Sequence, residues 1–417
     1  DPYGLREPLF ENTYDNYGNL IQQSDHQAGL EKEYRQDLIG RTIGMRDSRG
    51  FSLNMVYDGK NRVKTLIQKV GEEAVNTTFL YGEVEKKEKP GLLYGLEIDG
   101  AQRAAYTYDA LARQTRKILK LPDEMEYTTS YSYLPGAKEG LTTNLVSRVE
   151  NGDAQLDYTY DALGNIVTIS ENGDLKYSYK YDAMNRLIRE NDAWENKTIC
   201  YTYDLGGNLL SQKTYDYQLG ELSPSESAWE ETTYEYTNPD WKDQLSAYNG
   251  EEITYDAMGN PLNYRGMTLT WRKGRQLESL QKDDGSYLNF VYNCDGARVQ
   301  KSEDSANGST IKETRYYWNG DQLAALQDGE DLIQFTYDEK GIPFSMKIGE
   351  DVYYYLYNVQ GDVVGLLDSN GVEVVSYRYS SWGKILETVD TSDNQIAARN
   401  PFRYRGYILN EETGMYY

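Results

Sequence analysis

Short segments in which apolar and polar residues alternate recur along this chain, and stretches rich in Asp, Gly and Asn separate them. One such segment, Tyr158-Thr159-Tyr160, leads into a polar stretch, and Ile166-Val167-Thr168-Ile169 leads out of it. A period of two is typical of strands, and the intervening residues are turn formers. Because no long stretch keeps an apolar period of 3.6 residues, we expect few helices. Residues 136–149 are the nearest helical candidate.

A motif of seven residues repeats at these turns, with the form Tyr-Asp-x-x-Gly/Asn-Asn/Arg-apolar. Clear copies are YDNYGNL (14–20), YDALGNI (160–166), YDAMNRL (181–187), YDLGGNL (203–209) and YDAMGNP (255–261). Weaker copies begin at residues 57, 108, 292, 337 and 357. Neighbouring copies lie about 20 to 24 residues apart, a period typical of repeat architectures.

The residue types of the motif are those of a tight turn. Asp at the first turn position and Gly at the fourth are preferred in a type I β-turn, where the carboxylate accepts from backbone N–H groups. Gly or Asn also tolerates the left-handed conformation of a G1 bulge. Each copy therefore predicts one β-hairpin. The turn residues are Tyr14, Asp15, Gly18, Tyr160, Asp161, Gly164, Tyr181, Asp182, Asn185, Tyr203, Asp204, Gly207, Tyr255, Asp256 and Gly259.

Isolated hairpins are marginally stable in water, so the copies are expected to stack edge to edge. The fold class that follows is all-β, a continuous curved or spiral strip of antiparallel hairpins with little or no helix. Tyrosines two residues apart share one face of a strand and can stack on neighbouring strands. The repeat lapses at residues 214–250, where an acidic, Ser-rich stretch predicts a surface insertion.

The amino-acid composition excludes some classes of function. The chain has 417 residues with 41 Tyr, 7 Phe and a net charge of −24. So much acidity argues against a nucleic-acid partner, because such proteins concentrate Lys and Arg. Two cysteines, Cys200 and Cys294, allow at most one bridge, so no disulfide framework is expected, and whether they pair stays open. No signal peptide or membrane span is evident, and the first residue, Asp1, favours a piece of something longer.

The motif resembles the YD repeats of bacterial Rhs proteins, wall-associated protein A, the C component of insecticidal toxin complexes and animal teneurins. The last residues, 357–417, are similar to the Rhs repeat-associated core. Positions that match that signature are Asn358, Gln360, Gly361, Asp362, Val363, Tyr379, Trp382, Gly383, Asn400, Pro401, Phe402, Arg403, Tyr404, Arg405, Gly406, Tyr407, Glu412, Thr413 and Gly414.

The resemblance implies a β-shell that encloses a variable, usually toxic, C-terminal domain. In the family the signature continues into a self-cleaving, aspartyl-protease-like segment, and this sequence stops before it at Tyr417. No catalytic residue can therefore be carried over. We expect residues 1–356 to form the strip and 357–417 the truncated core signature, in one continuous structural unit.

The function that the resemblance implies is a non-enzymatic wall section of a secreted or surface-attached bacterial toxin. Its partner would be the chain's own downstream toxin domain, with no cofactor, no metal, no nucleic acid and no membrane span. The alternative is an adhesion module that binds a glycan or receptor through exposed aromatic side chains. Tyr353, Tyr354 and Tyr355, or Tyr316, Tyr317 and Trp318, are candidate clusters for such contacts.

Other candidate sites have simpler explanations. His26 follows Ser24 and Asp25, but contiguous residues do not form a catalytic triad, so a surface turn is expected. Carboxylate pairs such as Glu72-Glu73, Asp283-Asp284 and Glu411-Glu412 could serve a glycosidase, yet 67 acidic residues produce such pairs by chance. The motif aspartates Asp58, Asp109 and Asp338, like those named above, lack the spacing of an EF-hand calcium loop.

Arg403 and Arg405 differ from these candidates because they stand two apart in the signature. In a strand they would point to one face, with Phe402, Tyr404 and Tyr407 on the other. Two roles are open for them. They can pair with carboxylates of the shell, or they can position the segment that follows.

Overall fold

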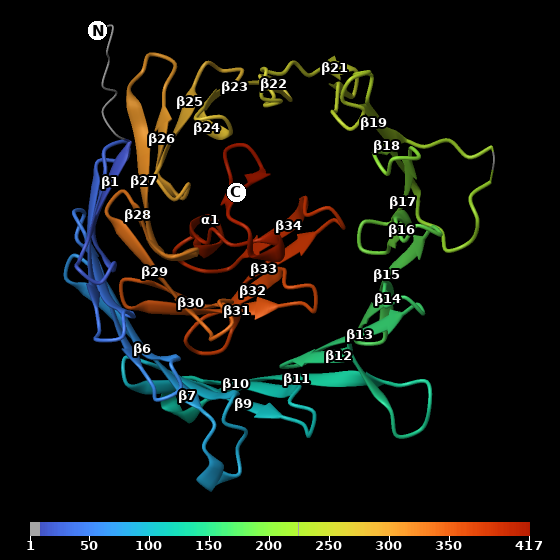
Figure 1. Cartoon of the computed structure of the whole chain (residues 1–417). Coiled ribbons are helices and arrows are strands. Elements are labelled where there is room, and N and C mark those ends of the chain that lie inside the picture. The colour runs from blue at the N-terminus through green and yellow to red at the C-terminus, as the bar shows by residue number, and fades with distance from the viewer. Residues whose placement is uncertain (1–8, 224) are drawn as a thin grey trace, which may run out of the picture. The chain divides into compact units, whose positions relative to one another are not determined.

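The chain divides into two compact units in the computed structural model, which describes residues 9–223 and 225–417. Unit 1 combines the described residues up to Thr128 with Ser286–Tyr417, and unit 2 is Thr129–Gly285. Figure 1 gives the elements in chain order. The expected boundary between residues 356 and 357 falls inside unit 1, so the division into strip and signature stays a prediction.

Unit 1 consists of two runs of strands and a short C-terminal segment. The first run is β1 (Phe10–Tyr14), β2 (Leu20–Asp25), β3 (Leu30–Gln36), β4 (Thr42–Asp47), β5 (Phe51–Tyr57), β6 (Val63–Val70), β7 (Glu73–Tyr81), η1 (Val84–Lys86), β8 (Leu93–Ile98), β9 (Ala101–Tyr108), β10 (Gln114–Lys120) and η2 (Pro122–Glu124). The second run is β25 (Tyr287–Tyr292), β26 (Arg298–Asp304), β27 (Thr310–Asn319), β28 (Gln322–Asp328), β29 (Asp331–Tyr337), β30 (Pro343–Ile348), β31 (Asp351–Tyr357), β32 (Val363–Leu367), β33 (Glu373–Tyr379) and β34 (Ile385–Asp390). The C-terminal segment holds α1 (Ile396–Arg399), η3 (Tyr404–Gly406), β35 (Leu409–Asn410) and β36 (Met415–Tyr416).

Unit 2 is a single run of strands. Its elements are β12 (Thr142–Asn151), β13 (Ala154–Tyr160), β14 (Ile166–Glu171), β15 (Asp174–Tyr181), β16 (Leu187–Asp192), β17 (Lys197–Tyr203), β18 (Leu209–Asp216), β19 (Glu230–Glu235), β20 (Ala247–Tyr248), β21 (Glu251–Glu252), β22 (Asn263–Tyr264), β23 (Met267–Arg272) and β24 (Gln276–Gln281), and β11 (Glu126–Pro135) runs into it from unit 1.

Through most of each unit, consecutive strands pair antiparallel, as hairpins require. In unit 1, β5 pairs β6 and β6 pairs β7, and in unit 2, β13 pairs β14 and β14 pairs β15. The described helical pieces are short, because α1 has four residues and each 3₁₀ turn has three. The predicted all-β fold of sequential hairpins with little helix is confirmed.

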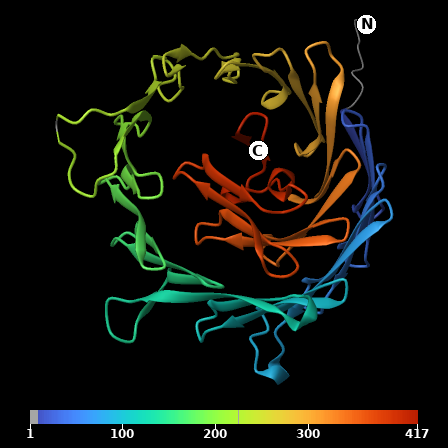
Figure 2. The same cartoon turned by 180° about the vertical axis from the view of Figure 1, so that it is seen from behind.

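Three layers pack on one another in unit 1. Leu93, Leu96 and Leu119 of the first run form one apolar core with Phe344 and Leu367 of the second run. A different core lies on the opposite face of the second run and includes Phe335, Phe402 and Ile408. The second run is therefore a sheet between the first run and the C-terminal segment, as Figure 1 and, from behind, Figure 2 show. Burial of apolar surface on both faces is the main force that holds these layers together.

Strand β31 illustrates why the middle layer is buried on both sides. Its sequence DVYYYLY directs Tyr354 and Leu356 into the core with the first run. Tyr353 and Tyr355, on the opposite face, lie in the core with the C-terminal segment. Because side chains alternate between faces, a continuous apolar stretch suits a strand that is covered twice.

Two local expectations from the sequence have different outcomes. The helical alternative for residues 136–149 is wrong, because Thr142–Asn151 forms β12. Its Thr and Val residues are β-branched and favour the extended backbone. Between β18 and β19, none of the described residues belongs to a helix or strand, which fits a surface insertion there.

Candidate functional site

The repeated turn has the same geometry in both units, and the hairpin of β13 and β14 shows it in full. Backbone N–H groups of Leu163 and Asn165 donate to Asp161 Oδ1, each at 2.9 Å. The N–H of Gly164 donates to the Asp161 carbonyl at 3.2 Å, and Gly164 has φ of 87°. The strand register shifts by one residue between Thr159 and Tyr160. These are the features of a type I turn with a G1 bulge.

Other copies repeat these contacts. Asp side chains that accept from the same pair of N–H groups are Asp15, Asp58, Asp109, Asp182, Asp256 and Asp338, and Asp204 accepts from the N–H of Asn208. Positive φ occurs at Gly18, Asn185, Gly207 and Gly259. At Asp161, the hydrogen bond from the Asn165 side chain, followed by the backbone N–H groups, lowers the pKa of the carboxyl.

The Asn or Arg that follows the turn glycine has a role that the sequence reasoning missed. The Asn165 side chain donates to Asp161 Oδ2 at 2.8 Å, and Arg186 Nε donates to Asp182 Oδ2 at 2.7 Å. One carboxylate oxygen thus caps the backbone while the other binds this side chain. The recurrence of a donor at this position was the signal that could have revealed the pair.

The motif tyrosines link successive hairpins through their hydroxyl groups. Tyr181 donates to the carbonyl of Ile166 at 2.9 Å, and Tyr203 donates to the carbonyl of Leu187 at 2.7 Å. We call this series the tyrosine ladder. Its described members are Tyr57, Tyr81, Tyr108, Tyr160, Tyr181, Tyr203, Tyr255, Tyr337, Tyr357 and Tyr379, each of which donates to a carbonyl 10 to 18 residues earlier.

Ring contacts of two kinds accompany the ladder. The expected contact between tyrosines of neighbouring strands occurs at Tyr234 and Tyr248, whose ring centroids lie 5.5 Å apart. The Arg186 guanidinium lies 4.7 Å from the Tyr203 ring centroid, and Arg62 lies 3.6 Å from that of Tyr81, so one repeat's arginine covers the next repeat's tyrosine. Tyr177 and Tyr179, two apart on β15, are stacked at 6.2 Å. Tyr14 is exposed, and its hydroxyl accepts from Asn12 at 3.3 Å.

In the C-terminal segment of unit 1, Arg403 is buried, with 1% of its surface exposed. Its guanidinium donates to the carbonyls of Ala397 and Asn400, pairs with Glu411 at 2.8 Å and lies 4.3 Å from the Tyr377 ring centroid. Hydrogen bonds from both terminal nitrogens of the guanidinium make its burial tolerable, although its Nε has no hydrogen-bond partner. Arg403 therefore fixes the C-terminal segment onto β33.

The expectation that Arg403 and Arg405 share a strand face is wrong. Residues 404–406 form η3, and Arg405 has φ of 55°, so the chain turns between the two arginines. Arg405 is exposed and donates from its backbone to Asp362 Oδ1 at 3.0 Å and from its guanidinium to the Gln360 carbonyl at 2.7 Å. The turn arises because Gly406, with φ of 73°, closes a short bridge between Phe402 and Ile408.

The remaining signature residues form turns or pack nearby. Gly361 and Gly383 have φ of 85° and 84°, and a Cβ on Gly383 would lie 2.6 Å from the Tyr404 ring. Pro401 and Phe402 are buried, whereas Trp382 is half exposed. Gly414 has φ of 67° in the turn before β36.

The tyrosine clusters named as candidates for glycan contact are buried. Tyr353, Tyr354, Tyr355, Tyr316 and Tyr317 are 7% exposed or less, because they lie between the layers of unit 1. Trp318, the sixth residue of these clusters, is partly buried, and its Nε1 donates to the Arg298 carbonyl at 2.6 Å. The suggestion that the five tyrosines bind sugar is therefore wrong. Their crowding in sequence reflects a strand covered on both faces.

The other candidates do not assemble into a reactive site. Ser24 donates to Glu31 at 2.5 Å, and Asp25 accepts from the N–H groups of Gln27 and Ala28, so neither is directed at the exposed His26. Cys200 and Cys294 are free thiols. Among residues 9–223 and 225–417, no three His, Cys, Asp or Glu side chains gather closely enough to hold a metal ion. In the same residues no helix has the length and apolar character to cross a membrane.

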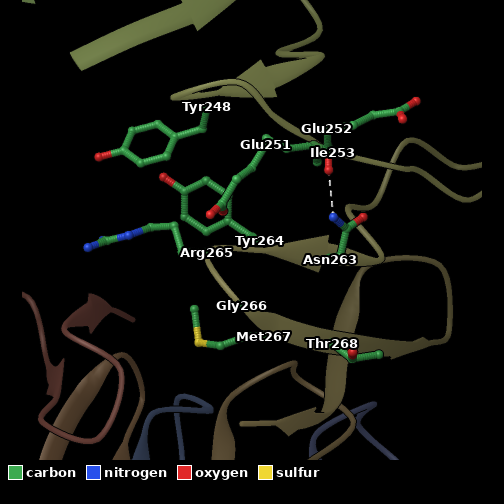
Figure 3. A pocket seen from close by; sticks show the side chains of 10 residues that line it. All are labelled: Tyr248, Glu251, Glu252, Ile253, Asn263, Tyr264, Arg265, Gly266, Met267 and Thr268. Carbon is green, nitrogen blue, oxygen red and sulfur yellow. Dashed lines mark hydrogen bonds between the residues drawn. The ribbon is translucent and has the colours of Figure 1, made fainter. Parts of the chain in front are cut away.

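Unit 2 contains a pocket of about 340 Å³ where the strands become short. It is lined by Tyr248, Glu251, Glu252, Ile253, Asn263, Tyr264, Arg265, Gly266, Met267 and Thr268. Figure 3 shows the rings of Tyr248 and Tyr264 beside the Glu251 and Arg265 side chains, while Glu252 points away. The Arg265 guanidinium lies 5.8 Å from the Tyr248 ring centroid. No sequence motif marked this pocket.

Comparisons with known proteins agree with the hairpin architecture. The RHS Repeat family matches residues 160–193. The tRNA nuclease WapA of Bacillus subtilis (strain 168) is 31% identical over 238 residues, which are 56% of this chain and 9% of that protein. The tRNA(Glu)-specific nuclease WapA of Bacillus subtilis subsp. natto is 34% identical over 180 residues, 42% of this chain and 7% of that protein. The chain thus spans less than a tenth of these relatives.

Solved structures match almost the whole chain. The crystal structure of TcdB2-TccC3 covers 98% of this chain, with a TM-score of 0.74 and 16% identity, and the match takes up 23% of that chain. A structure of TcdB2-TccC3 without its hypervariable C-terminal region also covers 98%, with a TM-score of 0.56 and 16% identity, and the match takes up 26% of that chain. At this identity the likeness concerns the fold.

Proposed function

Because the chain is a YD-repeat protein of the Rhs family, we propose that it forms part of the wall of a toxin shell. In this role it is not an enzyme: it encloses a toxin domain that belongs to the same polypeptide. The observation that carries the proposal is the match of 98% of the chain to the TcdB2-TccC3 structure at a TM-score of 0.74.

The physical character of the chain suits a wall. Most copies of the motif are closed by their own capped turn, as at Asp161, and tied to the preceding hairpin by a tyrosine hydroxyl, as Tyr181 is to Ile166. Such contacts are local, so the strip can be extended by adding repeats, as in other repeat proteins. In this proposal, residues 1–356 supply the strip and 357–417 the signature that ends it. The partner is the toxin domain, and the location is secreted or cell-surface attached.

Protection of the enclosed domain tests this proposal. The full-length polypeptide from the native gene is treated with a nonspecific protease, and the downstream domain is followed by its mass and its activity. We expect that domain to survive much longer inside the polypeptide than when it is expressed alone. Equal rates of cleavage would contradict the proposal.

A second measurement separates a container from a simple fusion. Mild urea that loosens the hairpins should expose the downstream domain at the same concentration at which the β-signal in circular dichroism falls. A downstream domain that is already active and cleavable at zero urea would show that the wall encloses nothing.

A further inference from the structure

A second pocket, which lies within unit 1, opens beside the C-terminal segment. Its volume is about 900 Å³, toward the upper end of the range of about 300–1,000 Å³ for small-molecule sites. The turns that precede β26, β28 and β30 contribute to its lining, and so do residues 402, 406–408 and 417. The pocket thus lies where three turns of the second run meet the last residues of the chain.

Aromatic rings form much of the pocket wall. The aromatic side chains that line it are Trp318, Tyr337, Phe402, Tyr407 and Tyr417. Three of them already use their polar atoms on backbone carbonyls: Trp318 Nε1 at 2.6 Å, the Tyr337 hydroxyl at 2.7 Å and the Tyr417 hydroxyl at 3.4 Å. What these side chains offer a ligand is therefore the surface of their rings.

The charged side chains at the pocket are mostly acidic. Asp295, Asp321 and Glu339 line it, against Lys340 alone among the cations. Asp295 pairs with Lys32 at 3.3 Å, whereas within residues 9–223 and 225–417 the carboxylates of Asp321 and Glu339 have no ion-pair partner. Two carboxylates beside aromatic rings are therefore available to a ligand.

This combination of groups selects the chemistry of a ligand. An anion would be repelled by the carboxylates. A metal ion needs several oxygen ligands close together, and no three His, Cys, Asp or Glu side chains of the described residues gather closely enough to hold one. An organic cation suits both parts of the pocket, because the face of an aromatic ring attracts a cation and a carboxylate pairs with it.

The tyrosine ladder shows how such a cation is held elsewhere in the protein. Guanidinium groups lie over ladder rings in three pairs, Arg41 and Tyr57 at 4.5 Å, Arg62 and Tyr81 at 3.6 Å, and Arg186 and Tyr203 at 4.7 Å. Each arginine directly precedes the residue whose carbonyl accepts the tyrosine hydroxyl. At Tyr337 the acceptor is Leu323, and the residue before it is the neutral Gln322, which also lines the pocket.

We propose that this pocket binds an organic cation, the guanidinium of an arginine side chain carried by a peptide. The guanidinium rests against the rings of Tyr337 and Tyr407 and pairs with Asp321 and Glu339. A guanidinium is favoured over an ammonium group because it is planar, weakly hydrated and able to stack on a ring. This binding goes beyond the wall function and does not depend on it, so either can fail alone.

A small probe tests the proposal directly. N-acetyl-arginine amide is titrated onto the chain, and binding is followed through the NMR signals of the probe. The citrulline analogue keeps the shape of arginine but is neutral, so it should bind roughly 10-fold more weakly or less well still. No binding of the arginine probe, or equal binding of the two probes, would overturn the proposal.

The full-length polypeptide from the native gene identifies the source of the arginine. If that polypeptide also binds the probe, the pocket is open and receives an arginine from another protein. If only the 417-residue chain binds the probe, a further segment of the same polypeptide supplies the arginine. Failure of both to bind would overturn the proposal.

Asp321→Asn tests the acidic part of the pocket. It should weaken the arginine probe several-fold with an unchanged thermal midpoint, because the exposed carboxylate loses its charge. The matched control is Asp153→Asn, since Asp153 follows Gly152 in a two-residue turn as Asp321 follows Gly320, and it does not line the pocket. Equal binding of the probe by the two variants would overturn the proposal.

Gln322→Arg tests the aromatic part by supplying a guanidinium from within the chain. The new side chain should cover the Tyr337 ring as Arg62 covers that of Tyr81, so the probe should bind roughly 10-fold more weakly while the thermal midpoint stays the same or rises. The matched control is Asn165→Arg, which stands at the same ladder position before Ile166 and does not line the pocket. Probe binding by Gln322→Arg that equals binding by Asn165→Arg would overturn the proposal.

Discussion

Strands β31 in unit 1 and β15 in unit 2 end in the same motif and differ in what covers them. In β31, four consecutive residues from Tyr353 to Leu356 are buried, whereas no residue of β15 is buried. Both lead into turns with the same capping contacts, at Asn358 and Asp182. The turn motif therefore fixes the hairpin, and the residues between motifs decide whether other layers pack on it.

Truncation of one tyrosine in each strand is the strongest way to test this difference. Tyr355 and Tyr179 each stand two residues before a motif tyrosine, and Tyr355 is 1% exposed while Tyr179 is half-buried. Tyr355→Ala should lower the free energy of unfolding of unit 1 by about 3–5 kcal/mol, and Tyr179→Ala should lower that of unit 2 by about half as much. Urea unfolding followed by hydrogen exchange in each unit measures both. Equal losses in the free energy of unfolding would mean that the packing of layers in unit 1 adds little to the stability of its strands.

The third layer of unit 1 depends on a buried charge, which Arg403→Met removes. The Asn400 carbonyl would then lose the guanidinium donor and the Ala397 carbonyl would keep only the Tyr377 hydroxyl, so we expect a loss of about 2–4 kcal/mol from the free energy of unfolding. Arg405→Met is the matched control, because Arg405 is exposed, and it should cost about 1 kcal/mol or less. The two urea midpoints give the comparison. A milder effect of Arg403→Met than of Arg405→Met would contradict the anchoring role.

Much of the fold could be predicted from the sequence because its determinants are local. The positions of Asp161, Gly164 and Asn185 follow from turn chemistry that acts over five residues. The layering of unit 1 could not be derived in the same way, because it joins β7–β10 to β30–β32 across more than 200 residues. The continuous apolar stretches of β31 and β32 were the available signal.

The sites were less predictable than the fold for a similar reason. Arg403 was recognised as notable, but its burial depends on a turn at Arg405 that breaks the expected strand. The pocket at Arg265 lies where the repeat is irregular, so the motif gave no guide to it.

Glycines in the two units should respond differently to the same change. Gly164→Val places a β-branched residue at φ of 87°, where its Cβ would make only an ordinary contact with Leu145 Cδ2 at 3.9 Å, and we expect a loss of about 1–2 kcal/mol from strain alone. Gly383→Val meets the same strain and also the Tyr404 ring, so its loss should be larger. Thermal midpoints of both variants test this. No loss of stability for Gly164→Val would mean that its turn is not left-handed, and equal losses at the two positions would mean that the Tyr404 ring moves aside at no cost.

Removal of single hydroxyls tests the tyrosine ladder in both environments. Tyr337→Phe in unit 1 leaves the Leu323 carbonyl buried without a donor, and we expect a loss of about 1–2 kcal/mol. Tyr181→Phe in unit 2, where the hydrogen bond is partly exposed, should cost about 0.5–1 kcal/mol. Urea unfolding resolves the difference. An unchanged free energy of unfolding in both variants would mean that the hydroxyl groups of the ladder do not contribute to stability.

Acid should act on the turns of both units alike, because the motif and not the layering sets their chemistry. The hydrogen bond from the Asn165 side chain lowers the pKa of the Asp161 carboxyl in unit 2. In unit 1, burial raises the pKa of the Asp58 carboxyl, but the hydrogen bonds from Arg62 outweigh burial, so this pKa is lowered as well. A carboxyl whose pKa is lower in the folded state than in the unfolded state stabilises the fold at pH values above its unfolded-state pKa of about 3.9. That stabilisation is lost as the pH falls through the folded-state pKa. Unfolding midpoints in urea should therefore drop between about pH 5 and pH 3 in both units.

The variant Asp161→Ser isolates one turn from this response. Ser380 occupies the same turn position in another copy, where its Oγ accepts from the N–H groups of Trp382 at 3.4 Å and Lys384 at 3.1 Å, so a hydroxyl can cap the turn without a charge. Unit 2 of the variant should depend less on pH over this interval, while unit 1 keeps its full response. An unchanged pH dependence of unit 2 would show that the Asp161 carboxylate is as well solvated in the turn as in the unfolded chain.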